Sequence, residues 1–283
     1  MTASDRTPPT RPDLRSWVHS ANDPRTDFPI QNLPLGVFSH RGSGDTRIGI
    51  AIGDRIADLR ALIDAGLLDS LEPRVVDACR SATLDRLMTL DRDSIRALRG
   101  PLSDALSAEG PLARDSAIQA RVVFPASEAR LTKPAVVENY TDFYASVEHA
   151  TNLGSMFRPD NPLLPNYKWV PIGYHGRASS IVVSGTEVKR PLGQTRDGDH
   201  PPSFGPTSRL DYELEVGAFI AMGNAQGTRI SIDRADDYIF GYCLVNDWSA
   251  RDIQAWEYQP LGPFLGKSFA TTISPWVVTT DAL

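Results

Sequence analysis

The apolar run at residues 238–245 limits the possible folds of this chain more than any other stretch of its sequence. A near-continuous run of this length predicts a strand that is covered on both faces. Asp247 follows directly, at the point where the strand is expected to end. The segment 246–258 then changes to helical spacing, so we expect a carboxylate at a strand end with a helix immediately behind it.

The helix expected after this strand has both a start signal and a polar face. Ser249 and Asp252 are spaced as in a capping box, which predicts that the helix begins there. Arg251, Gln254 and Tyr258 fall at i, i+3 and i+7 and therefore share one face. A cation, an amide and a phenol beside a carboxylate favour a functional site, although a capped surface helix would show the same residues.

The composition is that of an ordinary globular protein, and it excludes several classes of function. The 283 residues are 41% hydrophobic and 23% charged, and they carry a formal net charge of −6 without clusters of Lys and Arg. This length suffices for one large domain or two smaller ones, and the charge argues against a nucleic-acid surface. No apolar window is long enough for a membrane span, and the amino terminus lacks a signal-peptide core. We therefore expect a cytoplasmic protein that acts on a small molecule.

We expect the chain to divide into a lead-in and two domains. Residues 1–12 are polar and rich in proline, which predicts a disordered segment. Residues 13–125 contain a β-hairpin signature with its turn at residues 53–55 and then helical spacing at residues 59–110, which together predict a small mixed domain. A second domain is expected over residues 126–283. The two widely separated cysteines, Cys79 and Cys243, are expected to be buried thiols rather than a disulfide or a metal site.

Two acidic residues alternate with apolar ones in the segment LDYELEV at residues 210–216. A strand with this pattern presents Glu213 and Glu215 side by side. Neighbouring carboxylates repel each other unless a cation lies between them, which favours a hard metal ion; a half-exposed strand with solvated charges is the other interpretation. Asp142 and Asp247 would complete a set of four carboxylates, which suits Mg²⁺ or Ca²⁺ better than zinc.

One imidazole follows a β-prone segment at residues 136–144. Asp142 and Tyr144 share a face of that segment by the period of two, and His149 comes next in a helix-permissive stretch. If the three converge, the imidazole has a pKa suited to a general base near neutral pH, whereas a hydrogen-bonded core histidine is the alternative. The glycine-flanked turn around Tyr174 either brings backbone close to a ligand or is a structural turn.

Four segments, taken together and in order, resemble the fumarylacetoacetate hydrolase family. They are TDFYASVEHATNLGSMFRP (141–159), VPIGYHGRASSIVVSGT (170–186), DYELE (211–215) and NDWSARDIQAWEYQPLGPFLGKSFATTISPW (246–276). The resemblance extends from the region of residue 30 to the last residue and is dense from Asn139 onward. Segment 141–159 favours the members that hydrolyse fumarylacetoacetate over acylpyruvate-hydrolysing, decarboxylating or hydratase relatives.

The resemblance implies a fold, a reaction and a cofactor. The implied fold is mainly β with some α: a small N-terminal SH3-like β-barrel followed by a β-roll that pairs into a homodimer. The implied reaction is the metal-dependent hydrolysis of the carbon–carbon bond of 4-fumarylacetoacetate to fumarate and acetoacetate, the last step of tyrosine and phenylalanine catabolism. The implied cofactor is Mg²⁺, Ca²⁺ or both, and the substrate is a small β-diketone acid.

The resemblance also implies roles for individual residues. The implied ligands of the divalent metal are Asp142, Glu213, Glu215 and Asp247, with Lys267 and Thr271 close by at a second metal position. The implied general base is His149, and the implied donors to the oxyanion are Arg251, Gln254 and Lys267. The implied substrate contacts are Tyr144, Arg158, Tyr174, Gln254 and Tyr258.

The family pattern continues beyond Leu283 with further strands, a substrate-contacting threonine and the glutamate that orients the catalytic histidine. We therefore expect the β-roll at residues 126–283 to be incomplete, and the chain to be a fragment or a truncated gene product with little hydrolysis on its own. An acylpyruvate-type hydrolase is an alternative. A second alternative is a catalytically silent chain that keeps the metal site or the dimer surface. The coding DNA after codon 283 would distinguish such a chain from an active hydrolase.

Overall fold

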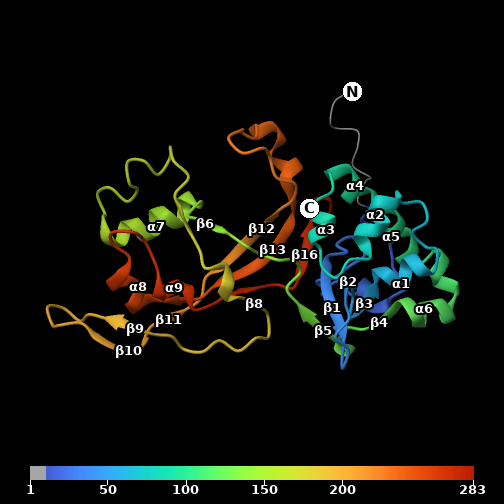
Figure 1. Cartoon of the computed structure of the whole chain (residues 1–283), viewed down its shortest axis with the longest axis horizontal. Helices are drawn as coiled ribbons and strands as arrows, with labels where there is room; N and C mark the ends of the chain where they lie inside the picture. The colour runs from blue at the N-terminus through green and yellow to red at the C-terminus, as the bar shows by residue number, and fades with distance from the viewer. Residues whose placement is uncertain (1–10) are drawn as a thin grey trace. The chain divides into compact units, whose positions relative to one another are not determined.

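The computed structural model describes residues 11–283, which form two compact units. The first unit consists of the described residues up to Val136 together with Glu215–Val245 and Ile273–Leu283. The second consists of Val137–Leu214 and Asn246–Thr272. Figure 1 shows the elements of each unit. Residues 1–10 of the expected lead-in lie outside the described part of the chain, and the expected domain limits stay a prediction.

The first unit is built on short strands that pair mainly antiparallel. Its strands are β1 (Leu35–His40), β2 (Thr46–Ile52), β3 (Arg55–Asp58), β4 (Val123–Pro125), β5 (Ala129–Thr132), β12 (Leu214–Ile220), β13 (Ile239–Asp247) and β16 (Trp276–Thr279). They are ordered β4-β3-β2-β1-β16-β13, and β5 also pairs with β1 while β12 pairs with β13. In the β2–β3 hairpin Ile52 is opposite Arg55, which confirms the predicted turn.

Five described helices of the first unit fall within the segment 59–110, for which helical spacing was predicted. They are α1 (Leu59–Asp64), α2 (Pro73–Cys79), α3 (Asp85–Met88), α4 (Arg92–Ala97) and α5 (Arg99–Leu106), and α6 (Ser116–Val122) lies beyond that segment. The carboxylate of Asp58 begins α1 by accepting hydrogen bonds from the backbone N–H groups of Arg60 and Ala61, and Arg47 pairs with the same carboxylate at 2.9 Å. The Asp58 carboxylate can be buried at the start of α1 because its charge is paired with Arg47. In return it binds two backbone N–H groups that have no partner within the helix.

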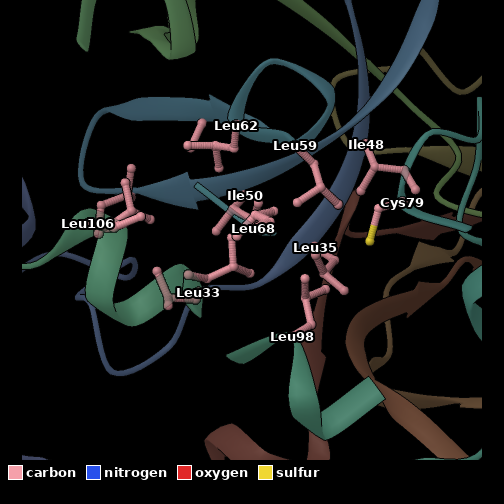
Figure 2. Close-up of a cluster of buried hydrophobic side chains, with 14 of the residues drawn as sticks. Leu33, Leu35, Ile48, Ile50, Leu59, Leu62, Leu68, Cys79, Leu98 and Leu106 are labelled. Atoms are coloured by element: carbon pink, nitrogen blue, oxygen red, sulfur yellow. The ribbon is translucent and has the colours of Figure 1, made fainter. Parts of the chain in front are cut away.

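The hydrophobic core of the first unit lies between these strands and helices (Figure 2). Fully buried side chains such as Ile50, Leu59 and Leu62 belong to it. Cys79 and Cys243 are both buried and free, as predicted. Burial raises the pKa of the Cys79 thiol to about 12 and that of Cys243 to about 11, so both stay protonated at neutral pH.

The second unit has shorter elements. They are β6 (Thr141–Phe143), α7 (Val147–Phe157), β7 (Gly173–His175), β8 (Ile181–Val183), β9 (Leu192–Thr195), β10 (Ser203–Pro206), β11 (Leu210–Asp211), β14 (Ser249–Ala250), α8 (Arg251–Glu257), α9 (Leu265–Ser268) and β15 (Thr271–Ile273). The strands pair as β6–β7, β9–β10, β11–β14 and β15–β8. Short 3₁₀ helices in the two units span His19–Asn22, Pro111–Arg114, Ala126–Glu128, Ala178–Ser180, Ile232–Tyr238 and Thr280–Ala282.

The described residues are thus mainly β with some helices, which confirms the predicted fold class at that level. None of the described helices combines the length and the apolar character that crossing a membrane requires.

Three local predictions were wrong. Strand β13 is not covered on both faces, since Leu244 is 61% exposed. The expected strand at residues 210–216 is interrupted between β11 and β12, because the N–H of Glu213 donates to the side chain of Asn246. In the segment 136–144 only Thr141–Phe143 is a strand, so Tyr144 lies just beyond it.

The predicted capping box was also wrong. Helix α8 begins at Arg251, after the short strand β14, and within the described residues its N-cap has no side-chain hydrogen bond. Asp252 cannot serve the cap because its carboxylate accepts hydrogen bonds from Thr207 and from Ser208. A long-range contact has therefore replaced the local one.

Candidate metal centre

Four carboxylates lie close together. Asp142, Glu213, Glu215 and Asp247 each offer an oxygen, and these oxygens all lie within 4.8 Å of one another. Asp142 comes from β6, Asp247 is the last residue of β13, Glu213 directly precedes β12, and Glu215 lies at the start of that strand. Asp247 is buried and the other three are partly buried. The structure therefore brings together the four acidic residues that the sequence singled out.

Backbone pairing explains how two of these carboxylates are placed. In the β6–β7 pair Asp142 is opposite Tyr174, and the phenol of Tyr174 donates a hydrogen bond of 2.7 Å to Oδ2 of Asp247. Where β11 and β12 are interrupted, the N–H of Asp247 donates to the carbonyl of Glu213 at 3.2 Å. The side chain of Asn246 accepts from the N–H of Glu213 at 3.2 Å. These bonds hold Glu213 and Asp247 next to each other.

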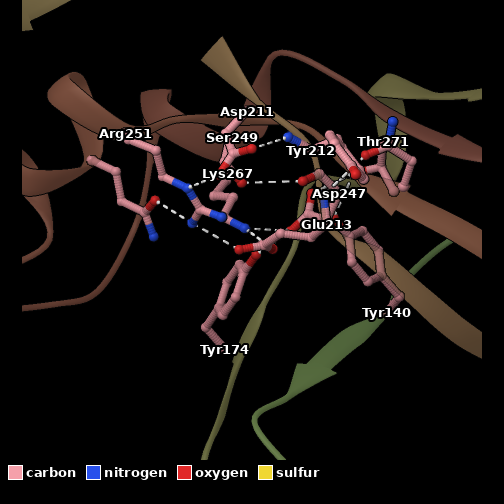
Figure 3. A network of polar contacts seen from close by, with 12 residues as sticks. Tyr140, Tyr174, Asp211, Tyr212, Glu213, Asp247, Ser249, Arg251, Lys267 and Thr271 are labelled. Carbon is pink, nitrogen blue, oxygen red and sulfur yellow. Dashed lines mark hydrogen bonds and ion pairs between the residues drawn. The ribbon is translucent and has the colours of Figure 1, made fainter. Parts of the chain in front are cut away.

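The buried side chain of Lys267 forms ion pairs with two of the carboxylates. The side chain of Lys267 is 7% exposed, and its Nζ donates to Glu213 and, at 3.1 Å, to Oδ2 of Asp247. Figure 3 shows this ammonium among the acidic groups. A buried ammonium needs such partners, because an unpaired charge is very costly to remove from water.

An arginine contacts the cluster from α8. The guanidinium of Arg251 reaches Oε1 of Glu213 at 2.7 Å and Oδ2 of Asp211 at 3.0 Å. The same side chain donates to Oε1 of Gln254 at 3.3 Å, so the predicted common face of Arg251 and Gln254 is confirmed. Tyr258, the third residue of that face, is the C-cap of α8, and its phenol is 3.2 Å from Nε2 of Gln259.

Thr271 and Tyr140 extend the network on the other side of Asp247. Oγ1 of Thr271 donates to Oδ1 of Asp247 at 3.1 Å, and the phenol of Tyr140 lies 3.2 Å from the same Oγ1 (Figure 3). A Cβ atom at Gly176 would overlap the ring of Tyr140. The turn around Tyr174 thus needs its glycine to make room for a side chain of the site.

The side chains of the cluster are close together and partly removed from water, and both conditions shift their pKa values. Burial raises the pKa of Asp142, and the charge of Asp247 raises it further, against a hydrogen bond from Tyr174 and the charge of Lys267. Burial and then the charge of Asp247 also raise the pKa of Tyr174, which therefore stays a hydrogen-bond donor. Burial raises the pKa of Tyr140 in the same way.

His149 lies in the first turn of α7, beside Tyr144. The two rings are edge to face with centroids 5.5 Å apart, and Ser146 caps the helix by accepting from the N–H of His149. Burial raises the pKa of Tyr144, while the charge of Arg158 lowers it. The structure therefore brings His149 and Tyr144 together, and the charge of Arg158 acts on the phenol. The guanidinium of Arg158 donates to the carbonyl of Pro162 at 3.1 Å.

The donor set fits a hard divalent cation. All four acidic residues offer oxygen, the ligand atom that Mg²⁺ and Ca²⁺ prefer, and no softer nitrogen or sulfur ligand belongs to the described cluster. Lys267 pairs with Glu213 and Asp247, and Arg251 pairs with Glu213. A divalent ion would add positive charge to this group of four acids.

Sequence reasoning missed Tyr140, Asp211 and Asn246. Asn246 is adjacent to Asp247, Asp211 lies two residues before Glu213, and Tyr140 directly precedes strand β6. Their roles depend on hydrogen bonds to residues far away in sequence, which periodicity does not report.

Two family models match the chain. The model described as "Fumarylacetoacetate (FAA) hydrolase C-terminal" matches residues 138–283, and the one described as "Fumarylacetoacetase N-terminal" matches residues 31–134. The chain belongs to the fumarylacetoacetate hydrolase family. All four acidic residues of the candidate centre fall within the first of these matches.

Curated members of the family are similar over most of this chain. The fumarylacetoacetase of Caenorhabditis elegans is 51% identical over 263 residues, which are 91% of this chain and 62% of the relative. That of Rattus norvegicus is 50% identical over 273 residues, 95% of this chain and 64% of the relative. The chain thus spans less than two thirds of the length of these relatives.

A solved structure of the family is more distant. The fumarylacetoacetate hydrolase of Exiguobacterium antarcticum is 19% identical, and the match covers 89% of this chain and 68% of that one with a TM-score of 0.47. So partial a likeness adds nothing to the family assignment.

Proposed function

We propose that this chain carries the metal-binding and substrate-binding residues of a hydrolase that cleaves fumarylacetoacetate to fumarate and acetoacetate. The observation that carries the proposal is the cluster of four carboxylates with Lys267 and Arg251 upon it. The names of the relatives, which are fumarylacetoacetases at 50–51% identity, support the choice of substrate.

Cleavage of a β-diketone needs an activated water at one carbonyl. His149 is proposed as the base that takes the proton from this water, since a neutral imidazole has a ring nitrogen that can accept one. It stands beside the Tyr144 ring at the start of α7, and the cap from Ser146 fixes that turn. Tyr144 is proposed to contact the substrate that the water attacks.

The attacked carbonyl oxygen gains negative charge and needs hydrogen-bond donors. Arg251, Gln254 and Lys267 are the proposed donors. Because Oε1 of Gln254 accepts from Arg251, its amide nitrogen remains as the donor atom. Lys267 is desolvated, and a buried ammonium acts more strongly on a developing charge than one in water.

The leaving group is an enolate whose charge also has to be stabilised. Asp142, Glu213, Glu215 and Asp247 would hold the divalent ion, which when bound supplies Lewis-acid stabilisation to the oxygens of the diketone. Thr271 would lie beside it through its bond to Asp247. As an ammonium, Lys267 has no lone pair, which favours a counter-charge over a ligand at the second metal position.

The remaining substrate contacts follow from charge and position. Arg158 is proposed to neutralise a carboxylate of the substrate, since a guanidinium suits bidentate pairing. Tyr174 and Tyr258 are proposed to contact the substrate from β7 and from the end of α8. We also propose that the native ion is Mg²⁺ or Ca²⁺. The proposed fold is a small N-terminal SH3-like barrel followed by a β-roll.

Assembly and location are also part of the proposal. The outward side of β12 exposes Leu214, Val216 and Ile220, which supports an apolar interface in a homodimer. The cytoplasmic location stays a prediction.

Hydrolysis of fumarylacetoacetate by a purified protein of the relatives' full length tests the function. We expect the diketone absorbance to fall in the presence of Mg²⁺ or Ca²⁺, and the rate to vanish with a chelator and in the Asp142→Ala variant. Asp199→Ala serves as the control, because that carboxylate is fully exposed. Turnover that is unaffected by both the chelator and Asp142→Ala would refute the metal-dependent mechanism.

A further inference from the structure

A single carboxylate joins the two short helices that carry the proposed oxyanion donors. Glu257 is the last residue of α8, and its Oε1 accepts hydrogen bonds from the backbone N–H of Phe264 at 2.9 Å and from that of Gly266 at 2.6 Å. These two N–H groups belong to the N-cap and the first turn of α9, which would otherwise lack partners.

The contact between α8 and α9 is unusually close at one point. A Cβ atom at Gly266 would lie 2.9 Å from both the Cβ and the backbone nitrogen of Gln254. Only glycine therefore allows the start of α9 to rest against the backbone of α8 at this distance. Figure 1 shows α8 and α9 as neighbours, in agreement with their contacts.

Lys267 is the next residue after this contact. Its backbone N–H donates to the carbonyl of Phe264 at 3.2 Å, and its side chain is buried with Nζ on Glu213 and Asp247. The position of the ammonium thus depends on where the first turn of α9 is held. We propose that Glu257 is a positioning residue, which fixes Lys267 and Gln254 relative to each other by binding the first turn of α9 to α8.

The two hydrogen bonds depend on the position of Oε1 of Glu257 rather than on the charge of its side chain. Both bonds use the same atom, Oε1, and both donors are backbone N–H groups. A glutamine offers a carbonyl oxygen at the same reach without a charge. An aspartate keeps the charge but withdraws the oxygen by one methylene. The two substitutions therefore separate position from charge.

Lysine acetylation reports the position of Lys267 without any measurement of turnover. The chain has four lysines, and Lys133, Lys168 and Lys189 are exposed whereas Lys267 is buried. Brief treatment with an acetylating ester, followed by proteolysis and mass spectrometry, gives a rate for each. In the wild-type protein we expect Lys267 to react far more slowly than the other three, which serve as internal controls.

The variants then decide the proposal. We expect Glu257→Gln to keep Lys267 protected, and Glu257→Asp to speed its acetylation about tenfold or more, because the lost hydrogen bonds allow α9 to open locally. Glu148→Asp, the same shortening at an exposed glutamate of the same unit, should change nothing.

Three results would overturn it. They are wild-type protection of Lys267 in Glu257→Asp, loss of protection in Glu257→Gln, and loss of the native near-ultraviolet circular dichroism in Glu257→Asp, which would mean that the carboxylate supports the whole unit. The proposal rests on the proposed function only for the chemical role of Lys267. A protein of the relatives' full length that shows the expected acetylation but no hydrolysis would refute that function and leave the positioning by Glu257 intact.

Discussion

The phenol of Tyr174 donates a hydrogen bond of 2.7 Å to Oδ2 of Asp247, the oxygen that Lys267 also binds. Tyr174 comes from β7 and Asp247 from the end of β13, so this bond joins two segments of the proposed centre. Burial keeps the pKa of Tyr174 high, and the phenol therefore remains a donor at neutral pH. A donor of this kind orients a ligating carboxylate from outside the coordination shell.

Replacing Tyr174 by phenylalanine should weaken divalent-ion binding about 10- to 100-fold, the usual effect of removing an outer-shell partner. The ring stays, so packing is conserved and the effect isolates the hydroxyl. Calorimetric titration with Mg²⁺ and Ca²⁺ measures it. Tyr212→Phe is the matched control, since that side chain is exposed. Equal affinities in the two variants would show that the bond to Asp247 does not orient the carboxylate.

In a protein of the relatives' full length, replacing His149 by alanine should lower turnover about 10²- to 10⁴-fold, the usual contribution of general acid–base catalysis. Metal affinity should not change, because the imidazole is not a proposed ligand. Steady-state kinetics and metal titration of the same preparation give both values. His200→Ala, at an exposed histidine, is the control. Near-normal turnover, or a fall in metal affinity, would assign His149 wrongly.

Asp252 should stabilise the protein through its contacts with the loop before β11. Its carboxylate accepts from the buried hydroxyl of Thr207 and from both the N–H and the hydroxyl of Ser208. Asp252→Ala leaves these donors without their acceptor and should lower the free energy of unfolding by about 1–3 kcal/mol. Urea denaturation measures the loss, and Asp199→Ala should cost far less. A loss no larger than that of Asp199→Ala would contradict the account.

The contribution of Asp252 should depend on pH in a defined window. Burial acts to raise its pKa, but the hydrogen bonds from Thr207, Ser208 and Ile253 outweigh it and bring the pKa to about 2. An unfolded aspartate titrates at about 3.9. Since the folded value is the lower one, the contribution is complete above pH 3.9 and disappears as the pH falls towards 2. The stability difference between wild type and Asp252→Ala should shrink over this window, and a constant difference would contradict the assignment.

The sequence predicted the features whose cause is local. The hairpin of β2 and β3 follows from its turn chemistry between two short apolar runs, and the shared face of Arg251 and Gln254 follows from helical spacing. The four carboxylates were singled out by alternation, by the strand end and by resemblance to a family. Their convergence needed the structure, because they come from three separate segments.

Two of the failures have one cause in common, which is competition from distant residues. Asp252 was expected to cap a helix, but Thr207, 45 positions away, takes its carboxylate. Glu213 was expected within a continuous strand, but the side chain of Asn246, 33 positions away, binds its N–H. Side chains of Asx type bind backbone groups readily, and sequence spacing does not show which partner prevails.

The central claim is that the four carboxylates form a site for a divalent cation. Calorimetric titration of the purified protein with Mg²⁺ and Ca²⁺, compared with Glu213→Ala and Asp247→Ala, tests it most directly. Each substitution removes one of few anionic ligands from a cluster of oxygen donors, so we predict that wild type and Asp199→Ala bind the ion and that both site variants lose binding. Unchanged affinity in both site variants would contradict the claim, because the carboxylates would then be ordinary partners of Lys267 and Arg251.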